Sequence, residues 1–287
     1  MSYKNFEQKV KKFSYSILAL AFIAGVLFMI INREKSEPVV VVAREEINIT
    51  IIPGWNLEQI AENWVEIGLV SSTKDVFDIL GSPVYSGGEE GKKIKFKNNE
   101  FKLLEERLKN VSYEGFLMPD TYRVYQDADL KEEVLVKVFN NLEGKITVEM
   151  REEIKKQGRS FYEILTMASM VEREAKVEED MKMVADIFWR RLDMNWALQS
   201  CATVNYITGK NDPGVTNADR EIDSSYNTYK YPGLPSGPIG NPGLNAIKAT
   251  IYPTENDNWY FMSGRDGEMH YGRTLDEHNS NVYNYLR

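Results

Sequence analysis

One glutamate stands among apolar residues at a spacing that would give it unusual chemistry. Phe161, Leu165 and Ala168 recur at helical spacing, and at about 100° per residue Glu172 falls within about 40° of all three. Apolar neighbours disfavour the charged form of a carboxyl group, so its pKa rises and it can keep a proton near neutral pH. A general acid needs that proton, which makes Glu172 a candidate catalytic residue.

The helix that would carry Glu172 has a well-marked start. Ser160 and Glu163 form the S-x-x-E pattern of a capping box, in which each side chain accepts a hydrogen bond from the other residue's amide. Glu174 points about 200° away from Glu172. A glutamate on a half-buried stripe more often pairs with an arginine or lysine than acts in catalysis, so helical geometry alone leaves a structural role open.

The composition is that of a folded protein without a nucleic-acid partner. The chain has 287 residues, 43% of them hydrophobic and 27% charged, enough for one large domain or two ordinary ones. A net charge of −8 argues against a binder of phosphate backbones. A single cysteine, Cys201, allows no internal disulfide, and two histidines provide no zinc cluster. We therefore predict neither a metal nor a cofactor.

Residues 14–31 form an uncharged, strongly apolar run. As a helix it would extend about 27 Å, enough to cross a hydrocarbon core. Four lysines precede it, so the positive-inside rule predicts a cytoplasmic N-terminus and an extracytoplasmic remainder. A cleaved signal peptide is the alternative, but residues 32–35 (Asn-Arg-Glu-Lys) stand where its small-residue cleavage site would lie. We predict a single-pass, uncleaved anchor in the cell (inner) membrane.

A small module follows the anchor. Residues 39–42 are β-branched and predicted to be extended, and residues 47–52 alternate as a strand until Pro53-Gly54. Asn56 can cap a helix that Gly68 ends, and Ser72 or Thr73 opens another. This strand-helix-helix order, with the run Ile-Pro-Gly-Trp-Asn-Leu-Glu-Gln-Ile-Ala, resembles a LysM-like module.

The predicted fold class is α+β, with an N-terminal transmembrane helix, a small LysM-like α+β module and a larger mixed α/β catalytic domain. Residues 82–99 are rich in Gly, Lys and Glu and read as a loop, and residues 101–108 as a short helix. The predicted boundaries are 1–13 for a cytoplasmic tail, 14–31 for the anchor, 32–45 for a linker, 46–81 for the module, 82–111 for a linker with the short helix, and 112–287 for the catalytic domain.

Amides and aromatic residues in the C-terminal part suit a sugar ligand. Gln199, Asn227, Tyr229 and Asn241 offer hydrogen bonds for hydroxyl groups and flat rings for a pyranose face. Residues 233–243 interleave glycine with proline, a composition that suits a rigid wall beside a cleft or a disordered linker, but not a nucleotide cradle. A neutral polymer fits this set better than a charged one.

Several separate runs in order resemble the endolytic murein transglycosylases, the YceG-like family. They are Ala-Ser-Met-Val-Glu-Arg-Glu-Ala at 168–175, Leu-Gln-Ser at 198–200, Tyr-Asn-Thr-Tyr at 226–229, Gly-Leu-Pro-Ser-Gly-Pro-Ile at 233–239 and Glu-His-Asn at 277–279. The resemblance implies a membrane-anchored enzyme that cuts nascent peptidoglycan strands and leaves 1,6-anhydro-muramyl ends. It also implies that Glu172 is the catalytic glutamate.

We predict a set of substrate-binding residues around that glutamate, namely Glu114, Tyr122, Gln199, Thr203, Tyr206, Asn227, Tyr229, Asn241 and His278. Two departures from the family pattern bear on them. Cys201-Ala202 stands where the family commonly has Asp-Pro, and the N-terminal module is abbreviated. The first departure concerns substrate positioning and the second the grip on the glycan.

Three alternatives to a transglycosylase stay open on sequence. A true hydrolase of the same glycan would use Glu114 or Asp120 as a second carboxylate. A non-catalytic glycan-binding scaffold for cell-wall synthesis is another reading, and an anchored protein with an unrelated ligand is the third. If the protein does cut nascent strands, cell-wall synthases are its expected partners.

Overall fold

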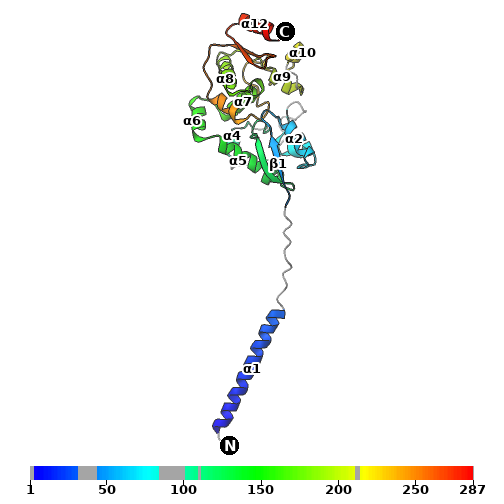
Figure 1. Ribbon diagram of the computed structural model, residues 1–287, viewed down its shortest axis with the longest axis vertical. Helices are drawn as coiled ribbons and strands as arrows, with labels where there is room; N and C mark the ends of the chain where they lie inside the picture. Colours follow the sequence, from blue (N-terminus) through cyan, green and yellow to red (C-terminus); the bar gives the residue numbers. More distant parts are fainter. Residues whose placement is uncertain (1–2, 32–43, 84–100, 109–110, 211–213, 287) are drawn as a thin grey trace. The chain divides into compact units, whose positions relative to one another are not determined.

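The computed structural model describes residues 3–31, 44–83, 101–108, 111–210 and 214–286. The chain divides into two compact units, Met1–Ala43 and Arg44–Arg287. The first holds a helix, α1 (Tyr3–Ile31; Figure 1). In the described part of the chain, no helix has both the length and the apolar character needed to cross a membrane. The extended segment predicted at 39–42 and residues 84–99 of the loop predicted at 82–99 lie outside the described residues.

A two-stranded sheet joins the start of the second unit to its middle. Strand β1 (Glu46–Ile51) pairs antiparallel with β2 (Asp120–Tyr125), with Ile49 opposite Tyr122. Ile49 and Ile51 are buried while Thr50 is exposed, which is the alternation that predicted this strand. Strand β1 lies in the predicted module and β2 in the predicted catalytic domain. Their pairing therefore connects the two predicted segments, and both segments belong to one compact unit. The LysM-like identity of 46–81 and the domain boundaries stay predictions.

Two capped helices follow β1, as predicted. Asn56 caps α2 (Leu57–Glu66) in a capping box with Gln59, and Ser72 caps α3 (Thr73–Leu80). Helix α2 buries Leu57 and its apolar stripe against the core. The next helix, α4 (Lys102–Glu105), is a single turn, shorter than the predicted span of 101–108.

The remaining elements of the second unit are mostly helical and lead into a C-terminal hairpin. They are η2 (Leu130–Val134), α5 (Leu135–Lys145), α6 (Val148–Lys156), α7 (Phe161–Glu174), α8 (Glu178–Asp193), α9 (Cys201–Thr208), α10 (Asn217–Arg220), α11 (Leu244–Ile251), β3 (Tyr260–Ser263), β4 (Met269–Gly272) and α12 (Leu275–Leu286). Strands β3 and β4 pair antiparallel. The α+β class is confirmed for the described residues.

Helix α7 lies inside the second unit (Figure 1). The predicted capping box of Ser160 and Glu163 is present, and α8 and α11 pack against the helix. Phe161, Tyr162 and every residue from 164 to 171 are buried. A helix that is buried on all sides offers side chains to several neighbouring elements at once. The amphipathic stripe inferred from sequence is therefore only one of its contact faces.

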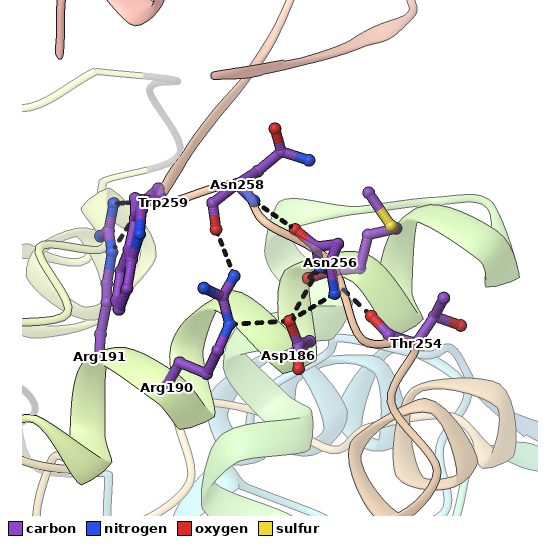
Figure 2. Close-up of polar contacts among 8 residues, drawn as sticks. Asp186, Arg190, Arg191, Thr254, Asn256, Asn258 and Trp259 are labelled. Atoms are coloured by element: carbon purple, nitrogen blue, oxygen red, sulfur yellow. Dashed lines mark hydrogen bonds and ion pairs between the residues drawn. The ribbon is translucent and has the colours of Figure 1, made fainter. Parts of the chain in front are cut away.

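Polar contacts fix the segment that precedes β3 onto α8 (Figure 2). The Asp186 carboxylate accepts from Arg190 Nε at 2.9 Å and from Asn256 Nδ2 at 3.0 Å. Arg191 Nε donates to the Trp259 carbonyl at 3.1 Å, and its Nη1 donates to the Leu198 carbonyl at 2.9 Å. One buried guanidinium thus ties the start of the C-terminal hairpin to the residue that precedes Gln199.

Candidate functional site

Glu172 lies on the last turn of α7, half-buried between two chain segments. The Gly243 amide donates to its Oε2 at 2.9 Å. Burial raises the pKa of the Glu172 carboxyl group, and the Gly243 hydrogen bond lowers it by a smaller amount. Within the described residues, no lysine or arginine contributes to that shift. The geometry therefore favours a proton-holding carboxyl group over a member of an ion pair.

Glycines allow the backbone to approach Glu172 closely. A methyl group on Gly54 would lie 3.5 Å from Glu172 Cγ, and one on Gly243 would lie 3.2 Å from Glu172 Oε2. Gly54 also has φ +82°, a conformation that favours glycine. The Pro53-Gly54 turn between β1 and α2 and the loop before α11 thus both contact the candidate acid.

That loop is fixed to the β1–α2 turn. The Gly54 amide donates to the Asn241 carbonyl at 2.8 Å, and the Asn241 amide donates to the Trp55 carbonyl at 2.7 Å. A Cβ on Gly240 would lie only 2.8 Å from the Gly54 carbonyl oxygen. These contacts agree with a rigid wall, one of the two readings of the Gly/Pro composition, and not with a linker.

Glu114 is a buried connecting group. Its carboxylate accepts from the Leu57 amide at 3.1 Å, from Asn241 Nδ2 at 3.2 Å and from the Tyr206 hydroxyl at 3.3 Å. Burial raises its pKa to about 8 against the lowering effect of these donors. Glu114 thereby connects the first turn of α2, the wall loop and α9. The structure brings Glu114, Tyr206 and Asn241 together, as members of one structural hydrogen-bond network.

A second half-buried carboxylate lies on α7 at Glu174. Its Oε1 accepts from the Ser200 hydroxyl at 2.5 Å, at the start of α9. Burial raises its pKa, while the Ser200 hydrogen bond and the nearby Arg173 charge lower it. Glu174 faces α9 while Glu172 faces Gly243, so the two carboxylates point to different elements as predicted. Sequence reasoning missed this contact because it treated α7 as buried on one face only.

Gln199 occupies a strained position next to this contact. Its φ is +54°, in the left-handed region that non-glycine residues seldom adopt. The segment is held from both sides, since the Leu198 carbonyl accepts from Arg191 and the Gln199 amide donates to the Thr228 carbonyl at 3.1 Å. The Gln199 side chain is exposed. Backbone strain that the surroundings maintain is typical of functional sites.

The other predicted contact residues fall into two groups. Tyr229 and His278 are half-buried: the Tyr229 hydroxyl lies 3.0 Å from Cys201 Sγ, and the His278 ring stacks on Tyr260 with centroids 5.4 Å apart. Asn227, Thr203 and Tyr122 are buried and bond to the protein itself. The Asn227 amide donates to two carbonyls, Thr203 lies 2.9 Å from the Thr228 hydroxyl, and the Tyr122 hydroxyl contacts Met118 and Asn141.

The Tyr122 hydroxyl thus bonds to protein groups, and the Asn227 amide shapes a loop. The sequence suggested sugar contacts for both residues, because an amide and a phenol form hydrogen bonds with sugar hydroxyl groups as readily as with backbone carbonyls. Among the described residues, no group of three or more His, Cys, Asp or Glu side chains is arranged to hold a metal ion.

Comparisons with known proteins identify the family. The model of the YceG-like family matches residues 4–284. A Bacillus subtilis protein named endolytic murein transglycosylase is 37% identical over 180 residues, covering 62% of this chain and 50% of that protein. A protein of the same name from Streptococcus pneumoniae is 34% identical over 182 residues, covering 60% of this chain and 32% of that one.

The fold agrees with this match. The crystal structure of a YceG-like protein from Listeria monocytogenes superposes with a TM-score of 0.67 at 30% identity, covering 81% of this chain and 75% of that one. The aligned region spans about half the length of the Bacillus relative and about a third of the Streptococcus relative. Because the family model extends over nearly the whole sequence, the chain belongs to the YceG-like family.

Proposed function

We propose that this protein is an endolytic lytic transglycosylase that cleaves the β-1,4 bond between N-acetylmuramic acid and N-acetylglucosamine in peptidoglycan. One observation carries the proposal: Glu172 is a half-buried carboxyl group with a raised pKa and an amide partner, and no cationic partner is found among the residues that the structure describes. The names of the Bacillus and Streptococcus relatives support the same substrate. No cofactor takes part in the proposed reaction.

In the proposed mechanism a single residue moves the proton twice. Protonated Glu172 donates to the glycosidic oxygen, and the bond from that oxygen to muramyl C1 breaks, releasing a 4-hydroxyl on the departing sugar. The Glu172 carboxylate then takes the proton of the muramyl C6 hydroxyl as that oxygen bonds to C1. The product is a 1,6-anhydro ring, and Glu172 ends protonated as it began. No water is consumed.

A hydrolase would need a second carboxylate to activate water or to act as nucleophile. Glu114 already accepts three donors inside the core, with 1% of its surface exposed. Asp120 is exposed and pairs with Lys145 at 2.8 Å. Both residues have structural partners, and this favours the single-acid mechanism.

Digestion of purified glycan strands tests the proposal. Wild-type protein should release fragments that end in anhydromuramic acid. Their mass should be about 18 units below that of the hydrolysis product, because no water is added. Glu172→Gln should release none while keeping the wild-type thermal melting profile. Fragments that carry the mass of added water would establish a hydrolase instead. Strand binding without cleavage by the wild-type protein would establish the scaffold.

We also propose that residues 14–31 anchor the protein in the cell (inner) membrane with the second unit outside. Support comes from the apolar run and from the exposure of large side chains such as Leu18, Phe22 and Phe28, a denser apolar surface than soluble proteins carry. This location would place Glu172 near cell-wall synthases, the partners we propose. Release of the protein from membranes by high salt or carbonate, without detergent, would contradict the anchor.

A further inference from the structure

A cavity of about 380 Å³ opens between α2, the end of α7 and α9. Its walls include Glu58 and Glu62 from α2, Arg173 from α7, and Ala202 and Lys210 near the two ends of α9. The volume falls within the range of small-molecule and peptide sites. Amides and an aromatic ring, from Asn56, Gln59, Asn205 and Tyr206, also line it, but the charged groups of both signs set it apart from a site for a neutral sugar alone.

The charges in this cavity are not paired with each other. In the described part of the chain, neither Glu58, Glu62 nor Arg173 forms a salt bridge, whereas Lys210 already pairs with Asp219 at 2.8 Å. Glu58 and Glu62 are four residues apart on α2, where like charges repel and slightly destabilise the helix. A ligand with an ammonium group on the α2 side and a carboxylate on the Arg173 side would relieve that repulsion and supply both missing partners.

The cavity adjoins the candidate acid. A methyl group on Gly54 would lie 3.5 Å from Glu172 Cγ and 3.7 Å from Arg173 Cδ, so both side chains flank the same backbone turn. Ile239, which also lines the cavity, immediately precedes Gly240 of the wall loop. A substituent that leaves the sugar ring close to the cleaved bond could therefore enter the cavity while Glu172 contacts the glycosidic oxygen.

A murein strand carries such a substituent. Its stem peptide is attached through a lactyl ether at C3 of muramic acid, two carbons from the C1 atom of the cleaved bond. The peptide bears carboxylates and, at a diamino acid, a primary ammonium group. We propose that this cavity binds the stem peptide, with Glu58 and Glu62 facing its ammonium group and Arg173 facing a carboxylate. This inference rests on the proposed function, because it assigns a binding site to the peptide part of the same substrate.

The test compares peptide-bearing glycan strands with the same strands after an amidase has removed their peptides. We expect the full-length wild-type protein to cleave the peptide-bearing strands with a kcat/KM about tenfold higher, the effect of one or two charge-assisted contacts. The ratio of kcat/KM for peptide-bearing strands to kcat/KM for peptide-free strands should fall toward one in Arg173→Gln and in the double variant Glu58→Gln/Glu62→Gln. Acetylation of the peptide amine should lower the wild-type ratio and leave that of the double variant unchanged.

Two matched variants serve as controls. Glu66→Gln changes an exposed carboxylate on α2 outside the cavity, and Arg265→Gln an exposed arginine near β3. Both should keep the wild-type ratio, and thermal melts should show all variants folded. A wild-type ratio of one, or variants that keep the wild-type ratio, would overturn the peptide site.

Failure of the proposed function gives a different result. Wild-type protein would then cleave neither strand preparation, and the affinity of the two preparations for Glu172→Gln protein would still test the cavity. Tighter binding of peptide-bearing strands, lost when Arg173→Gln is added, would support the peptide site without any cleavage. Equal affinities would overturn it.

Discussion

Replacing Glu114 with glutamine separates a mechanism with one carboxylate from a mechanism with two. Glu114 accepts from the Leu57 amide, Asn241 Nδ2 and the Tyr206 hydroxyl. Below its raised pKa of about 8 Glu114 is a neutral carboxyl group in which both oxygens can still accept, whereas glutamine replaces one of them with an NH₂ group that cannot, so at least one buried donor loses its acceptor. That loss costs about 1–3 kcal/mol. For a unit of this size we expect the melting temperature to fall by about 5 °C.

The pH dependence of the free energy of unfolding provides a second, independent test of the Glu114 side chain. Burial raises the pKa of Glu114 to about 8 from an ordinary value near 4.5. Between these values the folded protein holds a proton that the unfolded chain has released, so this contribution to stability is complete below pH 4.5 and is lost as the pH rises through 8. The slope reaches about 1.4 kcal/mol per pH unit. Glutamine does not titrate, so the variant should lose less stability than the wild type between pH 5 and pH 8.

The assay combines melting curves at pH 5 and pH 8 with glycan digestion at a temperature where both proteins are folded. We expect Glu114→Gln to cleave strands within about threefold of wild type, because its carboxylate binds protein groups and not substrate. The reasoning is refuted if the folded variant loses as much activity as Glu172→Gln, since Glu114 would then take part in the reaction. Parallel loss of stability in both proteins from pH 5 to pH 8 would refute the raised pKa.

Three further predictions concern the site and its supports. If protonated Glu172 is the acid, kcat/KM should fall as the pH rises through its raised pKa, and a rate that stays constant from pH 5 to pH 9 would exclude it. Gln199→Gly should relieve about 1 kcal/mol of backbone strain, raising the melting temperature by a few degrees while lowering cleavage, and no gain in stability would show that the position is unstrained. Arg191→Lys should destabilise the protein by about 2 kcal/mol in denaturant titrations, because lysine cannot reach both the Leu198 and the Trp259 carbonyls; an unchanged midpoint would contradict this.

Local signals in the sequence were enough for the elements that begin with a capping residue. Ser160 and Asn56 both cap the helices predicted for them, because capping is a contact between residues three apart. About 70 residues separate β1 from β2, and no local sequence pattern in either strand indicates with which strand it pairs. The end of α4 could not be predicted from local sequence either. The amphipathic pattern continues to residue 108, whereas the helix ends at Glu105.

Periodicity in the sequence predicted the burial around one side chain of the site, whereas contacts with residues distant in the sequence could not be predicted. Glu172 was found because its neighbours at helical spacing are buried. The contact of Glu174 with Ser200 and the place of Arg173 in the cavity wall could not be predicted, since α9 and α2 are distant from α7 in the sequence. Asn227 and Tyr122 have the chemistry of sugar contacts, but their polar atoms bind the protein itself. Composition shows what a side chain can bind, and the fold decides what it does bind.

The proposed single-acid mechanism needs Glu172 to be oriented without a second carboxylate, and the backbone provides that contact. The Gly243 amide holds one oxygen of Glu172, and the loop that carries Gly243 is joined to the β1–α2 turn by two short backbone hydrogen bonds through Asn241. The Asn241 side chain in turn contacts Glu114. Backbone donors fixed in this way need no reorganisation when charge moves during the reaction. In the proposed mechanism, the buried Glu114 side chain therefore supports Glu172 indirectly, by holding the two segments that flank it.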